Sequence, residues 1–278
     1  MRFRSARVSR RVSRRVSRRV SRAFLAVSCL ALFATALTGC SVLQSIGGSN
    51  TDYLPSNLAR STPSATTFQG CPPQGQGGDP ALNTLYNRED DNPPNGYRVT
   101  DISTVMTVPT TPQVDGKDRG AWSSADAKRI ALYEGTAIRT TGWVVAARKG
   151  GPTAANCGSD TSRDWYLWIG EGAGDALATT LVVVVTPRIQ ASRPGWTDYT
   201  FRRLVGQVVR VSGYLVYDQE PPSFIAQQRA TEWELQPVMH LETLYHNQWI
   251  NLDLFPFGSR VSGTPSPPPT IPAATIAP

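Results

Sequence analysis

Five segments rich in β-branched and aromatic residues follow one another along the chain, and their order is the strongest constraint on its fold. Turn-forming residues separate them, as expected for strands of a β-sheet. A short stretch with helical character, residues 196–204, lies between the third and the fourth. The predicted strands cover residues 137–148, 165–170, 181–186, 207–218 and 232–244.

Three strands, a helix and two more strands is the element order of the OB-fold, a five-stranded Greek-key barrel. Gly142 and Gly213 lie at similar places in the first and fourth strands, within Thr-Gly-Trp-Val-Val and Ser-Gly-Tyr-Leu-Val. A glycine inside a long strand indicates a bend or bulge, which a small barrel needs at its corners. We therefore expect a mainly β, OB-like barrel with a short helix between strands 3 and 4. A meander or sandwich of another topology is the alternative.

The composition of the chain changes on both sides of these strands. Residues 40–96 are rich in Ser, Gly, Asn, Pro and Gln, and such a segment buries too little apolar area to offset its ordering entropy. We expect a flexible tether there, an OB-like domain over 97–250, and a Pro-rich disordered tail over 251–278. Within the domain, Ser123 and Ser124 precede a predicted helix, 125–135, that ends in a glycine.

The first 39 residues have the composition of a bacterial signal peptide. Ten arginines and no acidic residue precede an apolar run, 23–37, which at about 15 residues is short for a membrane span of about 20. Leu37-Thr38-Gly39-Cys40 resembles the lipobox of bacterial lipoproteins, in which the cysteine carries the lipid. The resemblance implies acylation, as with palmitate, on Cys40 and a domain anchored in the cell envelope outside the cytoplasm. An uncleaved anchor is the alternative, and Sec and twin-arginine export both remain open.

Cleavage of this leader would change the charge and the cysteine content of the chain. Losing ten arginines takes the net charge from +7 to −3, which argues against a basic nucleic-acid-binding protein. Cys29 leaves with the leader and Cys40 carries the lipid. The remaining pair, Cys71 and Cys157, is predicted to form a disulfide in an oxidising compartment, with two free thiols as the alternative.

The sequence lacks the common signatures of catalytic and metal sites. His240 and His246 are the only histidines, too few for a zinc site with these cysteines. There is no Gly-x-Ser-x-Gly motif, and the Gly-rich segment 170–175 lacks the Lys-Ser/Thr of a phosphate-binding loop. We therefore predict no catalytic residue, metal or cofactor.

Three local motifs carry a resemblance to a family. They are Asn156-Cys157 with Asp164-Trp165-Tyr166, then Thr186-Pro187-Arg188, and then Arg229-Ala-Thr-Glu-Trp233-Glu234-Leu-Gln236-Pro-Val. Together they resemble a group of uncharacterised exported OB-like β-barrel proteins, over residues 136–242. This chain departs from the pattern at three positions: Tyr166 and Gln236 replace histidines, and Val184 replaces a glutamate.

The resemblance implies a cluster that binds a ligand or closes the barrel end. Its members are positions that match the family pattern and positions at which this chain departs from it. Because titratable groups are missing, we predict a non-enzymatic binding or structural module on the membrane, with an envelope protein or glycan as partner. The alternatives are a divergent hydrolase, of nuclease or phosphoesterase type, and an oligonucleotide-binding domain that stacks bases on Trp143, Tyr166, Trp168 and Tyr214. The cluster comprises Asn156, Asp164, Tyr166, Arg188, Arg229, Trp233 and Glu234.

Overall fold

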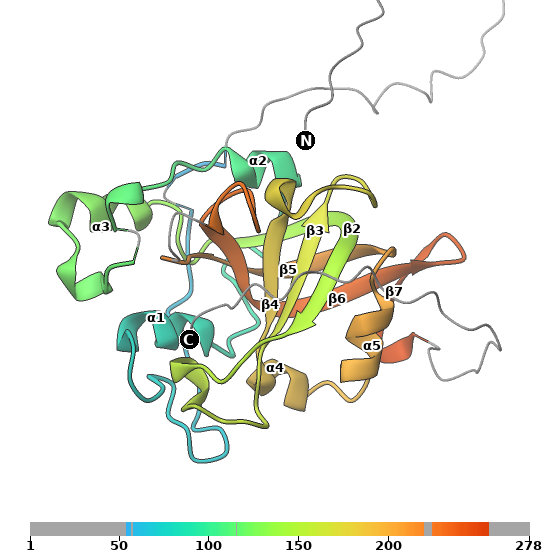
Figure 1. The fold of residues 1–278 in the computed structure, drawn as a ribbon, viewed down its shortest axis with the longest axis horizontal. Helices are drawn as coiled ribbons and strands as arrows, with labels where there is room; N and C mark the ends of the chain where they lie inside the picture. Colours follow the sequence, from blue (N-terminus) through green and yellow to red (C-terminus); the bar gives the residue numbers. More distant parts are fainter. Residues whose placement is uncertain (1–53, 57, 115, 220–223, 256–278) are drawn as a thin grey trace, which may run out of the picture. The chain divides into compact units, whose positions relative to one another are not determined.

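The computed structural model describes residues 54–56, 58–114, 116–219 and 224–255. These residues form a closed five-stranded barrel (Figure 1). Antiparallel pairs join β2 to β3, β3 to β4, β5 to β6 and β2 to β5, and a parallel pair joins β4 to β6. This is the strand order of the OB-fold, as predicted. The barrel strands are β2 Ala137–Lys149, β3 Trp165–Gly170, β4 Leu181–Val185, β5 Val208–Tyr217 and β6 Trp233–Tyr245.

Short elements extend the barrel. Strand β1, Arg98–Val99, pairs parallel with β2, and β7, Gln248–Asn251, forms a hairpin with β6. Helices α4, Pro187–Ala191, and α5, Asp198–Arg203, join β4 to β5, where one short helix was expected. The remaining helical elements are α1 Pro80–Tyr86, α2 Ile102–Met106 and α3 Ser124–Ile130, with 3-10 turns at Pro112–Val114, Arg119–Ala121, Ala154–Asn156, Leu177–Thr179 and Leu252–Leu254.

Helix α3 is the helix predicted from the serine pair. The Ser123 side chain accepts a hydrogen bond from the amide of Asp126 and caps the first turn. The helix ends at Ile130, and the chain reaches Gly135, at φ +77°, through successive turns. Glycine adopts this left-handed conformation without the steric cost of a Cβ, so Gly135 marks the end of the turns and not the end of the helix.

Large aromatic side chains form much of the buried core. Trp165, Trp233, Tyr214 and Tyr217 are completely buried, and the Tyr217 and Trp233 rings meet edge to face with centroids 5.0 Å apart. Phe201 of α5 packs on Trp165 at 5.3 Å, so the helix between β4 and β5 covers one end of the barrel.

The two strand glycines bring strands close together. The register of β5 against β6 shifts on both sides of Gly213, where an added Cβ would lie 2.7 Å from the Pro237 carbonyl oxygen. A Cβ on Gly142 would lie 2.7 Å from the Gly170 oxygen, but the nearby register shift in β2 falls between Val144 and Ala146. The predicted irregularity is therefore found at Gly213, whereas Gly142 permits a close approach within regular pairing.

The domain begins earlier than expected. From Leu58 to Gly96 the expected tether over 40–96 is instead a segment packed on the barrel, with α1 in it. Arg88 is 1% exposed, lies over the Tyr214 ring at 3.4 Å and pairs with Asp90 at 2.6 Å. Cation–π contacts, ion pairs and helix capping hold this polar segment in one conformation. These interactions depend on the tertiary structure, so the amino-acid composition does not predict them.

The domain also ends later than expected. Strand β7 and the 3-10 turn after it continue to Leu254, and Leu252 is buried. The expected disordered tail over 251–278 is therefore wrong for residues 251–254, and residues 256–278 lie outside the described residues. The predicted leader 1–39 and Cys40 lie outside them as well. No helix among the described residues is long and apolar enough to span a bilayer.

Candidate functional site

A cavity of about 510 Å³ opens at the end of the barrel where α1 meets the connection between β2 and β3. Its volume falls within the range of small-molecule sites, about 300–1,000 Å³. The connection from β5 to β6 contributes Asp218, and the first residues of β6 contribute Glu234 and Gln236. The other lining residues include Leu82, Asn83, Tyr86, Arg148, Thr153, Asp164 and Tyr166.

Asp164 is the most deeply placed acid of the β2–β3 connection, at 2% exposure. Thr153 caps the 3-10 turn Ala154–Asn156, and this turn directs Asn156 toward the carboxylate. The Asn156 side-chain amide lies 3.1 Å from both carboxylate oxygens, and the Thr153 hydroxyl donates to one of them at 3.5 Å. Burial outweighs these hydrogen bonds and raises the pKa of Asp164 to about 6.

Glu234 and Asp218 share one counter-ion. Arg229 lies 2.8 Å from Asp218 and 3.3 Å from Glu234, and all three side chains are largely buried. Tyr86 of α1 donates a hydrogen bond to Asp218 at 3.2 Å. Burial and then the charges of Asp218 and Glu234 raise the pKa of Tyr86 well above its usual value, so its hydroxyl remains a donor.

Gln236 and Tyr166 complete the wall of this cavity. Gln236 is 3% exposed, and its carboxamide makes no hydrogen bond to another described residue. Tyr166 is half-buried, and its ring lies against Trp168 with centroids 6.3 Å apart. Two of the three substituted positions singled out from the sequence motifs therefore line one cavity. Val184, the third, pairs with Tyr166 in the sheet but is buried in a small apolar cluster with Ala146, Trp168 and Val182.

The predicted cluster is thus divided. Asn156, Asp164, Tyr166, Arg229 and Glu234 lie at or beside the cavity. Trp233 belongs to the core, where its indole donates to the Pro109 carbonyl at 3.0 Å. Arg188 of α4 lies beside the disulfide, in a separate cavity of about 400 Å³, and donates to the carbonyls of Thr66, Cys71 and Pro72.

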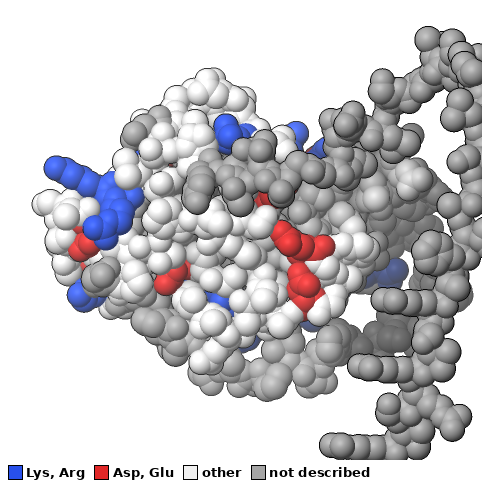
Figure 2. Space-filling view, turned by 90° about the horizontal axis from the view of Figure 1, so that it is seen from above, with Lys and Arg blue, Asp and Glu red and all other residues white. Residues whose placement is uncertain are grey.

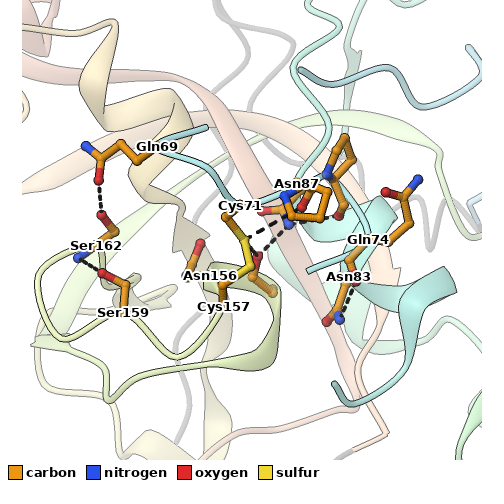
Figure 3. Close-up of a disulfide and its surroundings, with 12 residues drawn as sticks. Gln69, Cys71, Gln74, Asn83, Asn87, Asn156, Cys157, Ser159 and Ser162 are labelled. Atoms are coloured by element: carbon orange, nitrogen blue, oxygen red, sulfur yellow. Dashed lines mark hydrogen bonds between the residues drawn. A yellow bond between two sulfur atoms is a disulfide. The ribbon is translucent and has the colours of Figure 1, made fainter. Parts of the chain in front are cut away.

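A disulfide joins Cys71 to Cys157, as predicted, with the Cα atoms 5.8 Å apart (Figure 3). It attaches the segment before α1 to the β2–β3 connection. Two hydrogen bonds reinforce this attachment: the Asn87 side-chain amide donates to Ala155 at 2.7 Å, and the Gln76 amide donates to Ala154 at 2.8 Å. The wall formed by α1 is therefore fixed to the barrel.

Sequence reasoning missed the residues that α1 contributes, Leu82, Asn83 and Tyr86. A local signal for this helix exists at Asp79-Pro80. The Asp79 carboxylate caps the amides of Ala81 and Leu82, and proline occupies the first helical position.

Of the four aromatic residues predicted to stack bases, Trp168 and Tyr214 are buried, whereas Trp143 and Tyr166 are half-buried. Trp168 is 5% exposed and its indole donates to the Gln228 carbonyl, while Tyr214 is buried and donates to the Asp90 carbonyl. On the face in Figure 2, one group of Lys and Arg lies at the left edge beside acidic side chains, and other Lys and Arg are scattered over the face with uncharged residues between them. The described residues of that face form no continuous basic surface of the kind that single-stranded nucleic acid requires.

The two histidines lie apart from the cavity. His240 pairs with Asp91 at 2.8 Å, and His246 occupies the turn between β6 and β7. Within the described ranges, no group of three or more His, Cys, Asp and Glu side chains is arranged to hold a metal ion.

No protein-family model matches the sequence, and the search of curated proteins finds no match.

Proposed function

We propose that this protein is a lipid-anchored envelope protein whose barrel is a non-enzymatic binding module for a small polar ligand. The anchor rests on the sequence of residues 1–40, with its arginine-rich start, apolar run and lipobox-like end. The binding role rests on the cavity between α1 and the barrel end. OB-folds bind ligands through the connections between strands 1 and 2 and between strands 4 and 5, and both line this cavity.

The observation that carries the binding proposal is the combination of buried polar groups and open volume. Asp164, Glu234 and Gln236 are each at least 97% buried yet line a cavity of about 510 Å³. A protein interior without a ligand role is close-packed, and its polar groups are satisfied internally. Here the carboxamide of Gln236 is left to pair with an occupant of the cavity.

The anchor is tested by metabolic labelling with a palmitate analogue. The wild-type protein should be labelled and found with membranes, whereas Cys40→Ser should be unlabelled. Cys29→Ser is the matched control, because this second cysteine lies in the leader and should leave labelling unchanged. Labelling that survives Cys40→Ser contradicts the anchor.

The binding role is tested by thermal unfolding of the purified protein with panels of small saccharides, amines, amino acids and phosphorylated sugars. A ligand that binds the native state raises the melting temperature. Leu82→Trp places a large side chain in the cavity wall and should abolish the increase. Binding that persists in this variant, or the absence of any ligand-dependent increase, contradicts the proposed cavity.

A second candidate function, a hydrolase, is favoured by Asp164. A buried carboxyl group with a pKa of about 6, beside Glu234 in one cavity, has the properties of a general acid. Asp164→Asn and Glu234→Gln would then abolish turnover of a phosphoester or glycoside while the fold persists. Turnover that persists in both folded variants would contradict the hydrolase.

A further inference from the structure

The charges around the cavity disfavour an anionic ligand. Three carboxylates, Asp164, Asp218 and Glu234, line it, and Arg148 is the one cation among its described lining residues. Arg229 neutralises part of this charge from beside the cavity. A phosphate or carboxylate in this space would lose its hydration and face like charges at short range.

An organic cation is disfavoured for a different reason. The carboxylates of Asp218 and Glu234 are already paired with Arg229. Asp164 is held by Asn156 and Thr153, and its burial opposes the charged form. An ammonium group entering the cavity would lose its hydration and gain only carboxylates whose charge Arg229 already partly balances, or one whose burial opposes ionisation.

Gln236 points to the chemistry that does fit. Its carboxamide offers two donors and an acceptor, and no described residue uses them. A hydroxyl group both donates and accepts, so a ligand with adjacent hydroxyl groups can pair with the carboxamide while also donating to the carboxylates around it.

The rest of the wall suits the non-polar faces of such a ligand. Leu82 of α1, Pro152 and Ala155 of the β2–β3 connection and the ring of Tyr166 line the same cavity. Apolar walls with a few placed polar groups are typical of small-molecule sites, and C–H groups pack favourably on the electron-rich face of an aromatic ring. A sugar ring combines these hydroxyl edges and C–H faces.

We propose that the cavity binds an uncharged saccharide, an inference that rests on the proposed binding role and specifies its ligand. The hydroxyl groups pair with Gln236 and the carboxylates, and one ring face packs on Tyr166. The volume of about 510 Å³ accommodates more than one sugar ring.

Isothermal titration calorimetry on the purified chain tests this with four probes: maltose, N,N′-diacetylchitobiose, glucose 6-phosphate and putrescine. At least one neutral disaccharide should bind, and Gln236→Leu should weaken binding at least tenfold. Gln207→Leu, which changes an exposed glutamine outside the cavity, is the matched control and should bind like the wild type. Circular dichroism checks that each variant is folded.

A second variant keeps the test decisive if Gln236→Leu does not fold. Tyr166→Leu removes the aromatic wall from a half-buried position and should also weaken saccharide binding tenfold or more. If glucose 6-phosphate or putrescine binds more tightly than both neutral disaccharides, and Leu82→Trp abolishes that binding, the inference of an uncharged saccharide is contradicted. The binding site itself is then retained. If none of the probes binds, the saccharide inference fails, and the wider panel of the thermal test decides the proposed function separately.

Discussion

Replacing Asp164 by Asn should stabilise the protein at neutral pH but have much less effect in acid. The folded state raises the pKa of this carboxyl group from 3.8 to about 6. It therefore favours the protonated form, and ionisation of Asp164 costs stability. This cost is absent below the unfolded pKa of 3.8, grows between 3.8 and about 6, and is complete above about 6.

The magnitude follows from the size of the pKa shift. A difference of about two units corresponds to about 3 kcal/mol at 25 °C, since each unit is worth about 1.4 kcal/mol. Asp164 is 2% exposed, so solvent screening does not reduce this figure much. Asparagine keeps the shape and the acceptor for Asn156 and carries no charge. Between pH 4 and pH 7.5, the stability of Asp164→Asn relative to wild type should rise by about 2–3 kcal/mol.

Urea unfolding at several pH values, monitored by tryptophan fluorescence, measures this difference. Subtracting the wild-type curve is essential, because other groups act in the opposite direction. The hydrogen bond from Arg210 lowers the pKa of Glu242, for example, so that side chain contributes stability that is lost in acid. Asp160→Asn removes an exposed carboxylate from the same connection and controls for the loss of one charge. Parallel curves for Asp164→Asn and wild type across this range would refute the reasoning.

Three further predictions concern the disulfide, the buried ion pairs and the strand glycine. Replacing Cys71 and Cys157 by Ser should lower the free energy of unfolding by about 4–5 kcal/mol, because the disulfide restricts a loop of 86-residue separation in the unfolded chain. Equal urea midpoints of the wild type with and without reductant would contradict this. Arg229→Ala leaves two largely buried carboxylates without their shared counter-ion and should lower the free energy of unfolding in urea by about 3–5 kcal/mol. A decrease below about 1 kcal/mol would contradict the importance of this ion pairing. Gly213→Ala places a Cβ 2.7 Å from a carbonyl oxygen and should lower the free energy of unfolding by about 1–3 kcal/mol, measured by thermal unfolding. Gly174→Ala is the control: its added Cβ meets no atom within 4 Å, so stability should not change.

The barrel was predictable because its strands carry strong local signals. The run of five consecutive β-branched and leucine residues in β4, 181–185, is buried throughout, and β3 begins and ends where its pattern predicts. The element order then restricts the topology to very few choices. The glycine at 213 also indicated a real irregularity, since there the chain passes too close to β6 for any side chain.

The site was only partly predictable, because its parts come from segments that composition separates. The sequence motifs predict that Asp164, Tyr166 and Glu234 belong to one cluster, and these residues do meet at one cavity. Arg188 follows the same kind of motif but points from α4 toward the disulfide, a direction that sequence spacing does not reveal. Tyr86 cannot be predicted in the same way, because its segment is polar and rich in turn-forming residues. Its order depends on tertiary contacts with Asp218 and on the disulfide that precedes it.

If Cys40 carries a lipid, the ordered segment 58–96 limits how far the cavity can lie from the membrane. A tether of some fifty flexible residues would have a root-mean-square span of about 40 Å and a much longer maximum reach. Leu54 is already buried against the core, so only the thirteen residues 41–53 separate it from Cys40. Whatever their conformation, these residues span at most about 50 Å at about 3.5 Å per residue. With a lipid on Cys40, the barrel would therefore stay close to the bilayer, and its cavity would sample ligands near the membrane surface.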